Sequence, residues 1–264
     1  MKRLIFRIRL VIMYPLAIFA GLAYPLLLRI WPTAAARLRS LVPRLTGRGM
    51  LAMYGMPLKV LCRENLYLAE QQGCVLFTNH NSRLDPYVLF AALPFAFKSF
   101  WSSKAHVNSE GFNLAQWYGQ KLDLYFLHDK KDIRRTATEF RKATDYVRDG
   151  GVLSFFPEGR FSQDGKPGDF GVACSKLAIR AGVPIIPMCL EGSEAYFEQS
   201  GQMERGEVLL RVGRPISTEG LHPSQAQELS RRLEMSIVAM RHGEVLNCSD
   251  AGVVADNAVQ GSAS

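Results

Sequence analysis

Residues 74–85 read Cys-Val-Leu-Phe-Thr-Asn-His-Asn-Ser-Arg-Leu-Asp, an apolar run that passes directly into a polar turn. A short apolar run bounded by polar residues is typical of a buried β-strand, here Cys74–Thr78. Pro86 follows at once and begins a stretch, 86–93, with the pattern of a helix. These residues therefore predict a strand–turn–helix unit with His80 and Asp85 in the turn.

Outward from this unit, short apolar runs alternate with helical stretches along the rest of the chain. Such alternation indicates an α/β fold, with a central, mostly parallel or mixed sheet flanked by helices. Ligand sites in these folds gather beyond the carboxyl ends of the strands. The nucleotide-binding patterns GxGxxG and GxxxxGK[ST] do not occur in the sequence. Further strands are expected at 122–127, 152–156, 183–190 and 208–212, and further helices at 133–148, 173–181 and 223–240.

Positive charge is concentrated at the N-terminal end of the 264-residue chain. Residues 1–50 contain nine Lys and Arg and no acidic residue, so with a total of +8 the other residues sum to −1. This distribution argues against a protein that coats nucleic acid. A composition of 48% hydrophobic and 21% charged residues also excludes a disordered chain, a collagen and a coiled coil.

The N-terminal segment is expected to associate with a membrane. Residues 10–28 are uncharged and almost all apolar, and as a helix they would be roughly 28 Å long, close to the thickness of a hydrocarbon core. Three interpretations remain open: a cleaved signal peptide ending near Ala34, a single spanning helix containing Pro15 and Pro25, or a membrane-embedded or re-entrant helix followed by an amphipathic one. Leucines alternate with arginines over 33–53, as expected of a helix among anionic headgroups. The alternative for this stretch is an ordinary solvated helix face, and Pro43 is expected to interrupt it.

These patterns predict three parts: a membrane-embedded or interfacial helical segment over 1–55, an α/β domain over 56–246, and a small, polar and mobile tail over 247–264. The five cysteines are an odd number, scattered and without metal-ligand spacing, which favours reduced thiols and gives no support for a metal site. The expected location is the inner membrane, with the domain on the cytoplasmic face.

The turn after the first strand is the first candidate for chemistry. A carboxylate at Asp85 could hold one ring nitrogen of His80 and leave the other to take a proton from a hydroxyl near neutral pH. The alternative is that Asp85 only caps the helix that follows. Within the same turn, Ser82 and Arg83 are candidate substrate-binding residues.

A second candidate follows the strand at 152–156, in Phe156-Pro157-Glu158-Gly159-Arg160. Glu158 could accept hydrogen bonds from hydroxyls, Arg160 could bind a phosphate, and Gly159 would let a ligand approach the backbone. The alternative is a surface salt bridge in a tight turn. A third stretch, Gly182-Val183-Pro184-Ile185-Ile186-Pro187-Met188, is interpreted as structural, its prolines indicating an edge or terminal strand.

Together and in this order, the NHxxxxD block at 79–85, the FPEG block at 156–159 and the proline-containing strand at 183–187 resemble the glycerolipid acyltransferase family. The resemblance covers about 60–215. It implies His80 as general base, Asp85 as its partner, and Glu158 and Arg160 near a glycerol phosphate. It also implies that Lys104 helps to hold the phosphate.

The chain departs from the family pattern at anion-binding positions. Arg160 follows the glycine directly, and Phe170-Gly171-Val172-Ala173 lacks the lysine expected there. His128-Asp129-Lys130 also stands where an arginine is usual. The head group of the acceptor is therefore open, and Lys130, Lys131, Arg134 and Arg135 are possible substitutes.

The resemblance implies direct acyl transfer from acyl-CoA or acyl carrier protein to the hydroxyl of a lysolipid, above all 1-acylglycerol-3-phosphate. The expected partners are thus a membrane lipid and a thioester donor, with no nucleic acid, metal or bound cofactor. Alternatives are another lysolipid acceptor, a catalytically idle membrane-surface binding protein, and a hydrolase, although the GxSxG turn of hydrolases does not occur.

Overall fold

The computed structural model describes residues 15, 18–82, 84–102, 119–128, 132–159, 170–194 and 206–242. The strands in these ranges form a seven-stranded sheet in the order β1-β7-β6-β2-β5-β3-β4. Their bounds are β1 Leu58–Leu61, β2 Cys74–Thr78, β3 Lys98–Ser102, β4 Tyr125–His128, β5 Val152–Phe155, β6 Ile185–Glu191 and β7 Val208–Val212.

The sheet is mixed. Strands β6, β2, β5, β3 and β4 pair in parallel, as do β1 and β7, and the two groups meet antiparallel where β6 pairs with β7. This confirms the predicted α/β fold. The carboxyl ends of β2, β5 and β6 consequently lie along one edge, which is where the sequence predicts chemistry.

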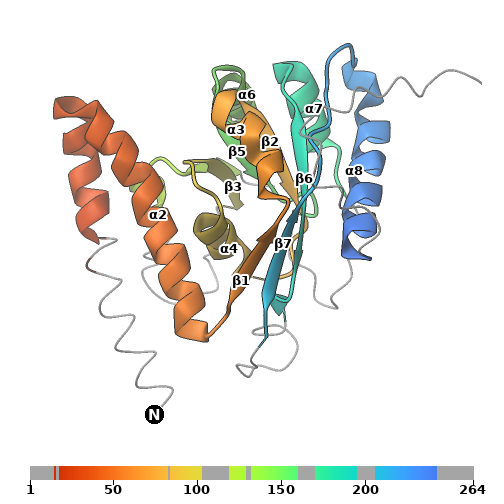
Figure 1. The fold of residues 1–264 in the computed structure, drawn as a ribbon. Helices are drawn as coiled ribbons and strands as arrows, with labels where there is room; N and C mark the ends of the chain where they lie inside the picture. The colour runs from red at the N-terminus through yellow and green to blue at the C-terminus, as the bar shows by residue number, and fades with distance from the viewer. Residues whose placement is uncertain are drawn as a thin grey trace, which may run out of the picture.

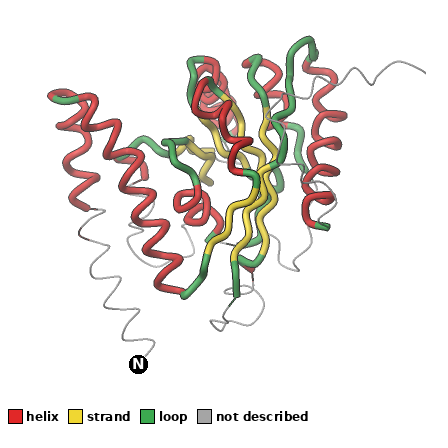
Figure 2. The backbone as a smooth tube through the Cα atoms, in the orientation of Figure 1, coloured by secondary structure: helices red, strands yellow, loops and turns green. Residues whose placement is uncertain are grey.

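Helices cover both faces of the sheet (Figures 1 and 2). One face carries α2, α4 and the short helices η1 and α3, and the other carries α6, α7 and α8. Strand β2 serves both faces, since Leu76 points into the first layer and Val75 and Phe77 point into the second. The helix bounds are α2 Pro32–Tyr54, η1 Arg63–Leu66, α3 Tyr67–Gln71, α4 Asp85–Ala92, α6 Ile133–Arg148, α7 Ala173–Ala181, η3 Pro223–Gln225 and α8 Ala226–Arg241.

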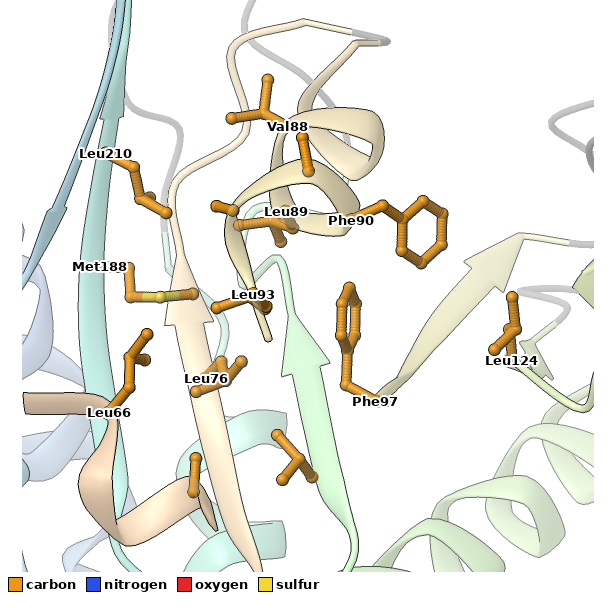
Figure 3. Close-up of a cluster of buried hydrophobic side chains, with 14 of the residues drawn as sticks. Leu66, Leu76, Val88, Leu89, Phe90, Leu93, Phe97, Leu124, Met188 and Leu210 are labelled. Carbon is orange, nitrogen blue, oxygen red and sulfur yellow. The ribbon is translucent and has the colours of Figure 1, made fainter. Parts of the chain in front are cut away.

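Helix α4 is held in place by leucines on the first face of the sheet. Figure 3 shows Leu89 of α4 and Leu93, the residue directly after this helix, facing Leu76 of β2 and Met188 of β6. All four side chains are at most 2% exposed. Burial of this kind contributes about 1.5–3 kcal/mol for each large side chain, so it fixes the position of the helix that begins at Asp85.

Helix α2 is continuous through Pro43, so the expectation that this proline interrupts it is wrong. Proline cannot donate to the carbonyl one turn earlier, but the helix continues because its buried face is anchored on α4. Three residues after Pro43, Thr46 Oγ1 donates to the Val42 and Pro43 carbonyls at 2.9 and 2.8 Å. At Gly47 the two helices approach so closely that a Cβ would lie 2.5 Å from the Tyr87 carbonyl oxygen.

Strand β6 is not an edge strand, which corrects the interpretation of Pro184 and Pro187. Pro184 precedes the strand, and its carbonyl accepts from Val75 N at 3.0 Å. On the side of β7, Ile185 exchanges two hydrogen bonds with Ile216, and the Pro187 carbonyl accepts from Gly213 N at 2.8 Å. The register that pairs Met188 with Val212 places Gly213 opposite Pro187, and β7 ends at Val212. The N–H that Pro187 lacks therefore falls just outside the paired residues of β6 and β7.

The N-terminal segment is helical over 18–30 and turns at Trp31 into α2, so that two helices lie side by side (Figure 1). Several of its large apolar side chains are exposed, among them Phe19 at 67% and Leu22 at 65%. Within the described residues, no helix is both long enough and apolar enough to cross a membrane. The whole of the predicted tail, 247–264, and part of 10–28 lie outside the described residues.

The cysteines only partly follow the sequence prediction. Cys74, Cys174 and Cys189 are free and buried, as expected of reduced thiols. Cys62 is disulfide-bonded, which the prediction of reduced thiols did not anticipate.

Candidate active site

His80 lies directly beyond the carboxyl end of β2, where the strand leaves the sheet. Its Nδ1 is 2.8 Å from Oδ2 of Asp85, the first residue of α4. The histidine side chain is 16% exposed and the aspartate side chain is fully buried. The strand–turn–helix unit therefore places a buried carboxylate behind an imidazole that solvent can reach.

Asp85 does more than begin a helix. Its Oδ2 accepts from the backbone N–H groups of Asn81 and Ser82 at 2.6 and 2.9 Å, and its Oδ1 accepts from Ser193 Oγ at 2.5 Å. Leu84 is the N-cap of α4, and no side chain caps that end. The interpretation of Asp85 as a cap alone is therefore wrong, because its hydrogen bonds organise the turn that carries His80.

Two asparagines fasten the turn to strand β6. The Asn79 amide both donates to the Leu190 carbonyl at 2.8 Å and accepts from the Leu190 N–H at 2.7 Å. Asn81 Nδ2 donates to the same carbonyl at 2.7 Å. Both asparagines are 1% exposed, so these bonds satisfy polar groups that would otherwise be costly to bury. They fix the path of the backbone on each side of His80.

The loop after β5 supplies the other wall of the site. The Phe156 ring stacks on the imidazole of His80, with centroids 4.2 Å apart and an interplanar angle of 23°. Glu158 Oε1 accepts from the His80 backbone N–H at 2.9 Å. The NHxxxxD and FPEG blocks, 71 positions or more apart in the sequence, thus meet around one histidine.

Of the other predicted site residues, the structure describes two, Gly159 and Ser82. Gly159 is exposed and has a φ of 61°, a left-handed conformation that favours glycine. Ser82 is fully buried, with its Oγ accepting from Leu84 N at 3.2 Å, so it shapes the turn and offers no open face to a substrate. Arg83, Lys104 and Arg160, and the possible substitutes Lys130 and Lys131, lie outside the described residues.

Two contributors to the site are not among the residues predicted from the sequence. Ser193 follows Glu191-Gly192 at the carboxyl end of β6, and the rule that placed the other candidates beyond strand ends could have found it. Phe156 ends the strand expected at 152–156, and an aromatic residue at the end of an apolar run is typical of a core position. Within the described residues, no cluster of His, Cys, Asp or Glu has the arrangement of a metal site.

This arrangement is suited to general base catalysis. With Nδ1 of His80 directed at Asp85, Nε2 is the ring nitrogen that can accept a proton from a substrate. The buried carboxylate would stabilise the imidazolium that forms, and the stacked Phe156 ring restricts rotation of the imidazole. A hydroxyl brought to Nε2 would be activated as a nucleophile.

Comparison with known proteins gives a consistent result. The family model described as Acyltransferase matches residues 59–191. The chain is 27% identical over 147 residues to 1-acyl-sn-glycerol-3-phosphate acyltransferase BAT2 of Brassica napus, covering 54% of this chain and 40% of that protein. It is 25% identical over 171 residues to a protein of Mycoplasma pneumoniae named as a probable 1-acyl-sn-glycerol-3-phosphate acyltransferase, covering 60% and 58%. Each match thus spans less than two thirds of the relative.

Among solved structures, the chain is similar to the crystal structure of the 1-acyl-sn-glycerophosphate (LPA) acyltransferase PlsC from Thermotoga maritima. The TM-score is 0.67 at 18% identity, and the match covers 91% of this chain and 98% of the other. At this identity the likeness shows the fold alone.

Proposed function

The chain belongs to the acyltransferase family, and from that premise we propose that it moves a fatty acyl group from a thioester donor to the free hydroxyl of a lysolipid. The acceptor proposed is 1-acylglycerol-3-phosphate, and the product is phosphatidate. The observation that carries the proposal is the 2.8 Å contact between His80 Nδ1 and the buried Asp85 carboxylate.

In the proposed step, the lysolipid hydroxyl attacks the carbonyl carbon of the thioester while His80 Nε2 takes its proton. The new C–O bond forms, the C–S bond breaks, and the thiolate receives the proton from the imidazolium. Asp85 stabilises the charged imidazole between these events. The step needs no acyl-enzyme, because the acceptor itself is the nucleophile.

The acceptor is proposed from the names of the relatives and from the residues around His80. Glu158 stands beside the histidine and is proposed to order the acceptor's polar group. Arg160, Lys104 and Arg83 are proposed to bind its phosphate and Gly159 to form part of the surface against which it lies, whereas Ser82 acts only through the shape of the His80 turn. Guanidinium and ammonium groups are suited to a phosphate, and Gly159 leaves room for close approach. The donor is proposed to be acyl-CoA or acyl carrier protein.

We also propose that the protein works at a membrane, where a lysolipid and its product reside. The exposed apolar side chains of 18–31 and the arginines of α2 support this location. An apolar surface beside basic groups is the combination that binds a helix to an anionic bilayer surface.

The test is an assay of the purified chain in detergent with lysophosphatidate and a long-chain acyl-CoA, following thiol release and phosphatidate formation together. His80→Ala is expected to reduce turnover by at least about a thousandfold, since it removes the proton acceptor. His242→Ala is the control, because that histidine is exposed at the end of α8. Near-normal turnover in His80→Ala would contradict the mechanism.

Parallel assays with neutral and zwitterionic lysolipids test the acceptor. Thiol release with one of these, and none with lysophosphatidate, would retain the chemistry and reject the proposed acceptor. Replacing acyl-CoA by acyl carrier protein in the same assay separates the two donors.

A further inference from the structure

A cavity of about 490 Å³ opens between the second half of α2, strand β1 and the end of α4. Apolar residues, among them Leu51, Met56, Leu58, Val60 and Ala91, make up most of its lining, but the exposed surface is about equally polar and apolar. None of its lining residues belongs to the turn of His80 or to the loop after β5. Its volume is in the range of small-molecule sites, so a ligand of some size can be accommodated.

Two of the residues that line this cavity, Arg48 and Arg63, carry positive charge. Arg44 lies one turn before Arg48 on α2 and is half-buried, and its Nε is buried without a hydrogen-bond partner. Burial lowers the pKa of Arg44 below its ordinary value, and the nearby charges of Arg48 and Arg63 lower it further. Arg48 and Arg63 line the same cavity and Arg44 lies one helical turn from Arg48, so three like charges share this region and repel one another.

Within the part of the chain that the structure describes, no acidic side chain forms an ion pair that would balance this repulsion. Among the ion pairs of the described residues, none involves Arg44, Arg48 or Arg63. Repulsion among these arginines raises the free energy of the protein when nothing is bound beside the cavity. An anion bound between them would be attracted by all three charges. Guanidinium groups bind phosphate in a planar, two-pronged geometry, which makes a phosphate group the best-fitting anion.

The surroundings indicate that the phosphate is attached to an apolar body. Leu41, Arg44, Leu45 and Arg48 follow the i, i+3, i+4, i+7 spacing and so share one face of α2. On this face Leu41 is 52% and Leu45 is 44% exposed. Apolar side chains thus continue from the cavity along the exposed face of the helix, as expected for contact with hydrocarbon.

We propose that this cavity binds an anionic phospholipid, with its phosphate on Arg44, Arg48 and Arg63 and its apolar portion against Leu58, Val60 and Met56. The site is separate from the proposed reaction and does not depend on it. Here the lipid is a bound ligand, held against the side of the domain.

The test uses the full chain in detergent, without an acyl donor, titrated separately with phosphatidylglycerol, phosphatidylcholine and inorganic phosphate. Lipid that remains on the protein after gel filtration is extracted and quantified, and the thermal midpoint is recorded at each concentration. We expect phosphatidylglycerol to be retained and to raise the midpoint. Phosphatidylcholine and inorganic phosphate are expected to do neither to a comparable extent.

The matched variants are Arg48→Gln with Arg63→Gln, and Arg37→Gln, which removes an exposed charge elsewhere on α2. The double variant is expected to weaken phosphatidylglycerol binding by about tenfold or more, and the Arg37 variant by less than about twofold. In lipid-free protein the double variant should melt at the same or a higher temperature, because it relieves repulsion. Weaker phosphatidylglycerol binding together with an unchanged or higher melting temperature would show that the double variant has lost the ligand site and not its stability.

Three results would overturn the proposal. One is equal retention of phosphatidylglycerol and phosphatidylcholine, and another is unchanged phosphatidylglycerol binding by the double variant. The third is full stabilisation by inorganic phosphate, which would make the cluster a simple phosphate site. None of these measurements requires turnover, so their failure is distinct from failure of the proposed acyl transfer.

Discussion

At the scale of single residues, the two oxygens of Asp85 have unequal surroundings. Within the described residues, Oδ2 receives His80 Nδ1 and two backbone N–H groups, whereas Oδ1 receives Ser193 Oγ alone. Ser193 is therefore the group that fixes the rotation of the carboxylate about its side-chain bond. Ser193 is fully buried and its hydroxyl donates to Asp85, so it acts on His80 through the carboxylate, as a positioning residue.

Replacing Ser193 by alanine should lower kcat by about tenfold and leave KM nearly unchanged, since a hydrogen bond to a charged group contributes about 1.5–3 kcal/mol. The measurement is steady-state kinetics over a range of pH. Ser193→Thr, which keeps the hydroxyl, should recover part of the lost rate.

Ser175→Ala is the matched control for that variant. Ser175 is equally buried, but its hydroxyl pairs with Ser230 between α7 and α8. If both alanine variants lost stability alike and neither lost kcat, Ser193 would be a packing residue and the positioning role would be wrong.

The sequence predicted the pair His80 and Asp85 because both lie in one turn, five positions apart, after an obvious strand. Ser193 lies 108 positions from Asp85, and only the parallel pairing of β2 with β6 brings the two together. Spacing along the sequence therefore predicts the contact between His80 and Asp85, but it cannot predict the contact between Asp85 and Ser193.

At the scale of elements, the position of α4 depends on a close approach to α2. A Cβ at Gly47 would lie 2.5 Å from the Tyr87 carbonyl oxygen and 2.7 Å from Ala91 N. Both atoms belong to the backbone of a helix and cannot move aside as a flexible side chain could.

Gly47→Ala should therefore destabilise the protein, although alanine favours a helix by about 1 kcal/mol over glycine. Overpacking costs typically 1–3 kcal/mol and more where backbone must shift, so a net loss of about 1–3 kcal/mol is expected in urea unfolding. Ala36→Val, which adds bulk at an exposed position of the same helix, should change stability by less than about 1 kcal/mol. Equal effects would mean that the two helices can separate without cost.

A second link joins α2 to the far edge of the sheet. Lys98 Nζ is 2.7 Å from Asp123 and lies 4.7 and 4.8 Å from the centroids of the Phe126 and Tyr146 rings. Arg39 of α2 donates to the Asp123 carbonyl at 3.1 Å. The Lys98 side chain is only 11% exposed, so its charge depends on these partners.

Asp123→Asn should cost about 1–2 kcal/mol of unfolding free energy, less than a fully buried pair because the Asp123 side chain is 56% exposed. Asparagine tolerates the positive φ of 54° at this position, so the variant tests charge at constant backbone conformation. Asp145→Asn, in an exposed pair with Arg148, is the control and should cost less than about 0.5 kcal/mol. A similar cost at both positions would contradict the role given to burial.

The bounds of elements with a clear hydrophobic pattern are predictable to the residue from the sequence. Elements that depend on contacts with residues distant in the sequence are not. The helices at Ile133–Arg148 and Ala173–Ala181 and the strands at Cys74–Thr78 and Val208–Val212 have the predicted bounds. Strand β3 begins with Lys98, a charge that no strand pattern would place inside, and it became acceptable only through Asp123. Strand β1 is a four-residue edge strand with little burial to mark it.

At the scale of the whole molecule, burial of three thiols links stability to pH. Burial raises the pKa of Cys74 to about 12 and of Cys189 to about 11, and raises that of Cys174 as well. In the unfolded chain the thiols ionise near their ordinary value of 9.0. Above that pH the unfolded state loses protons that the folded state retains, so the stability present below about pH 9 is lost as the pH rises further.

The free energy of unfolding should thus fall by about 1 kcal/mol per pH unit for each buried thiol above about pH 9. Urea unfolding at intervals between about pH 8 and 10 measures the slope, before the tyrosines titrate. Cys74→Ala should reduce the slope by about a third, whatever it does to stability at neutral pH. An unchanged slope would show that other groups cause the alkaline loss.

The sequence alone predicts the concentration of positive charge at the N-terminal end, but it does not predict which arginines lie close together in the fold. The sequence shows nine basic residues among the first fifty, and it does not show that Arg44 and Arg48 meet Arg63 beside a cavity. That encounter requires α2 to lie over β1 and α4, which is a property of the packed molecule.

The hydrogen bonds of the His80 turn have a further consequence for the chemical ageing of the protein. An asparagine deamidates when the backbone nitrogen of the next residue attacks its side-chain amide, and Asn81-Ser82 is a sequence prone to this reaction. In the fold, the two nitrogens that could attack are both donating to carboxylates, His80 N to Glu158 and Ser82 N to Asp85. The two amides are themselves held by Leu190. The same contacts that orient the histidine should therefore preserve both asparagines during storage, and deamidation at Asn79 or Asn81 would report molecules in which the turn has opened.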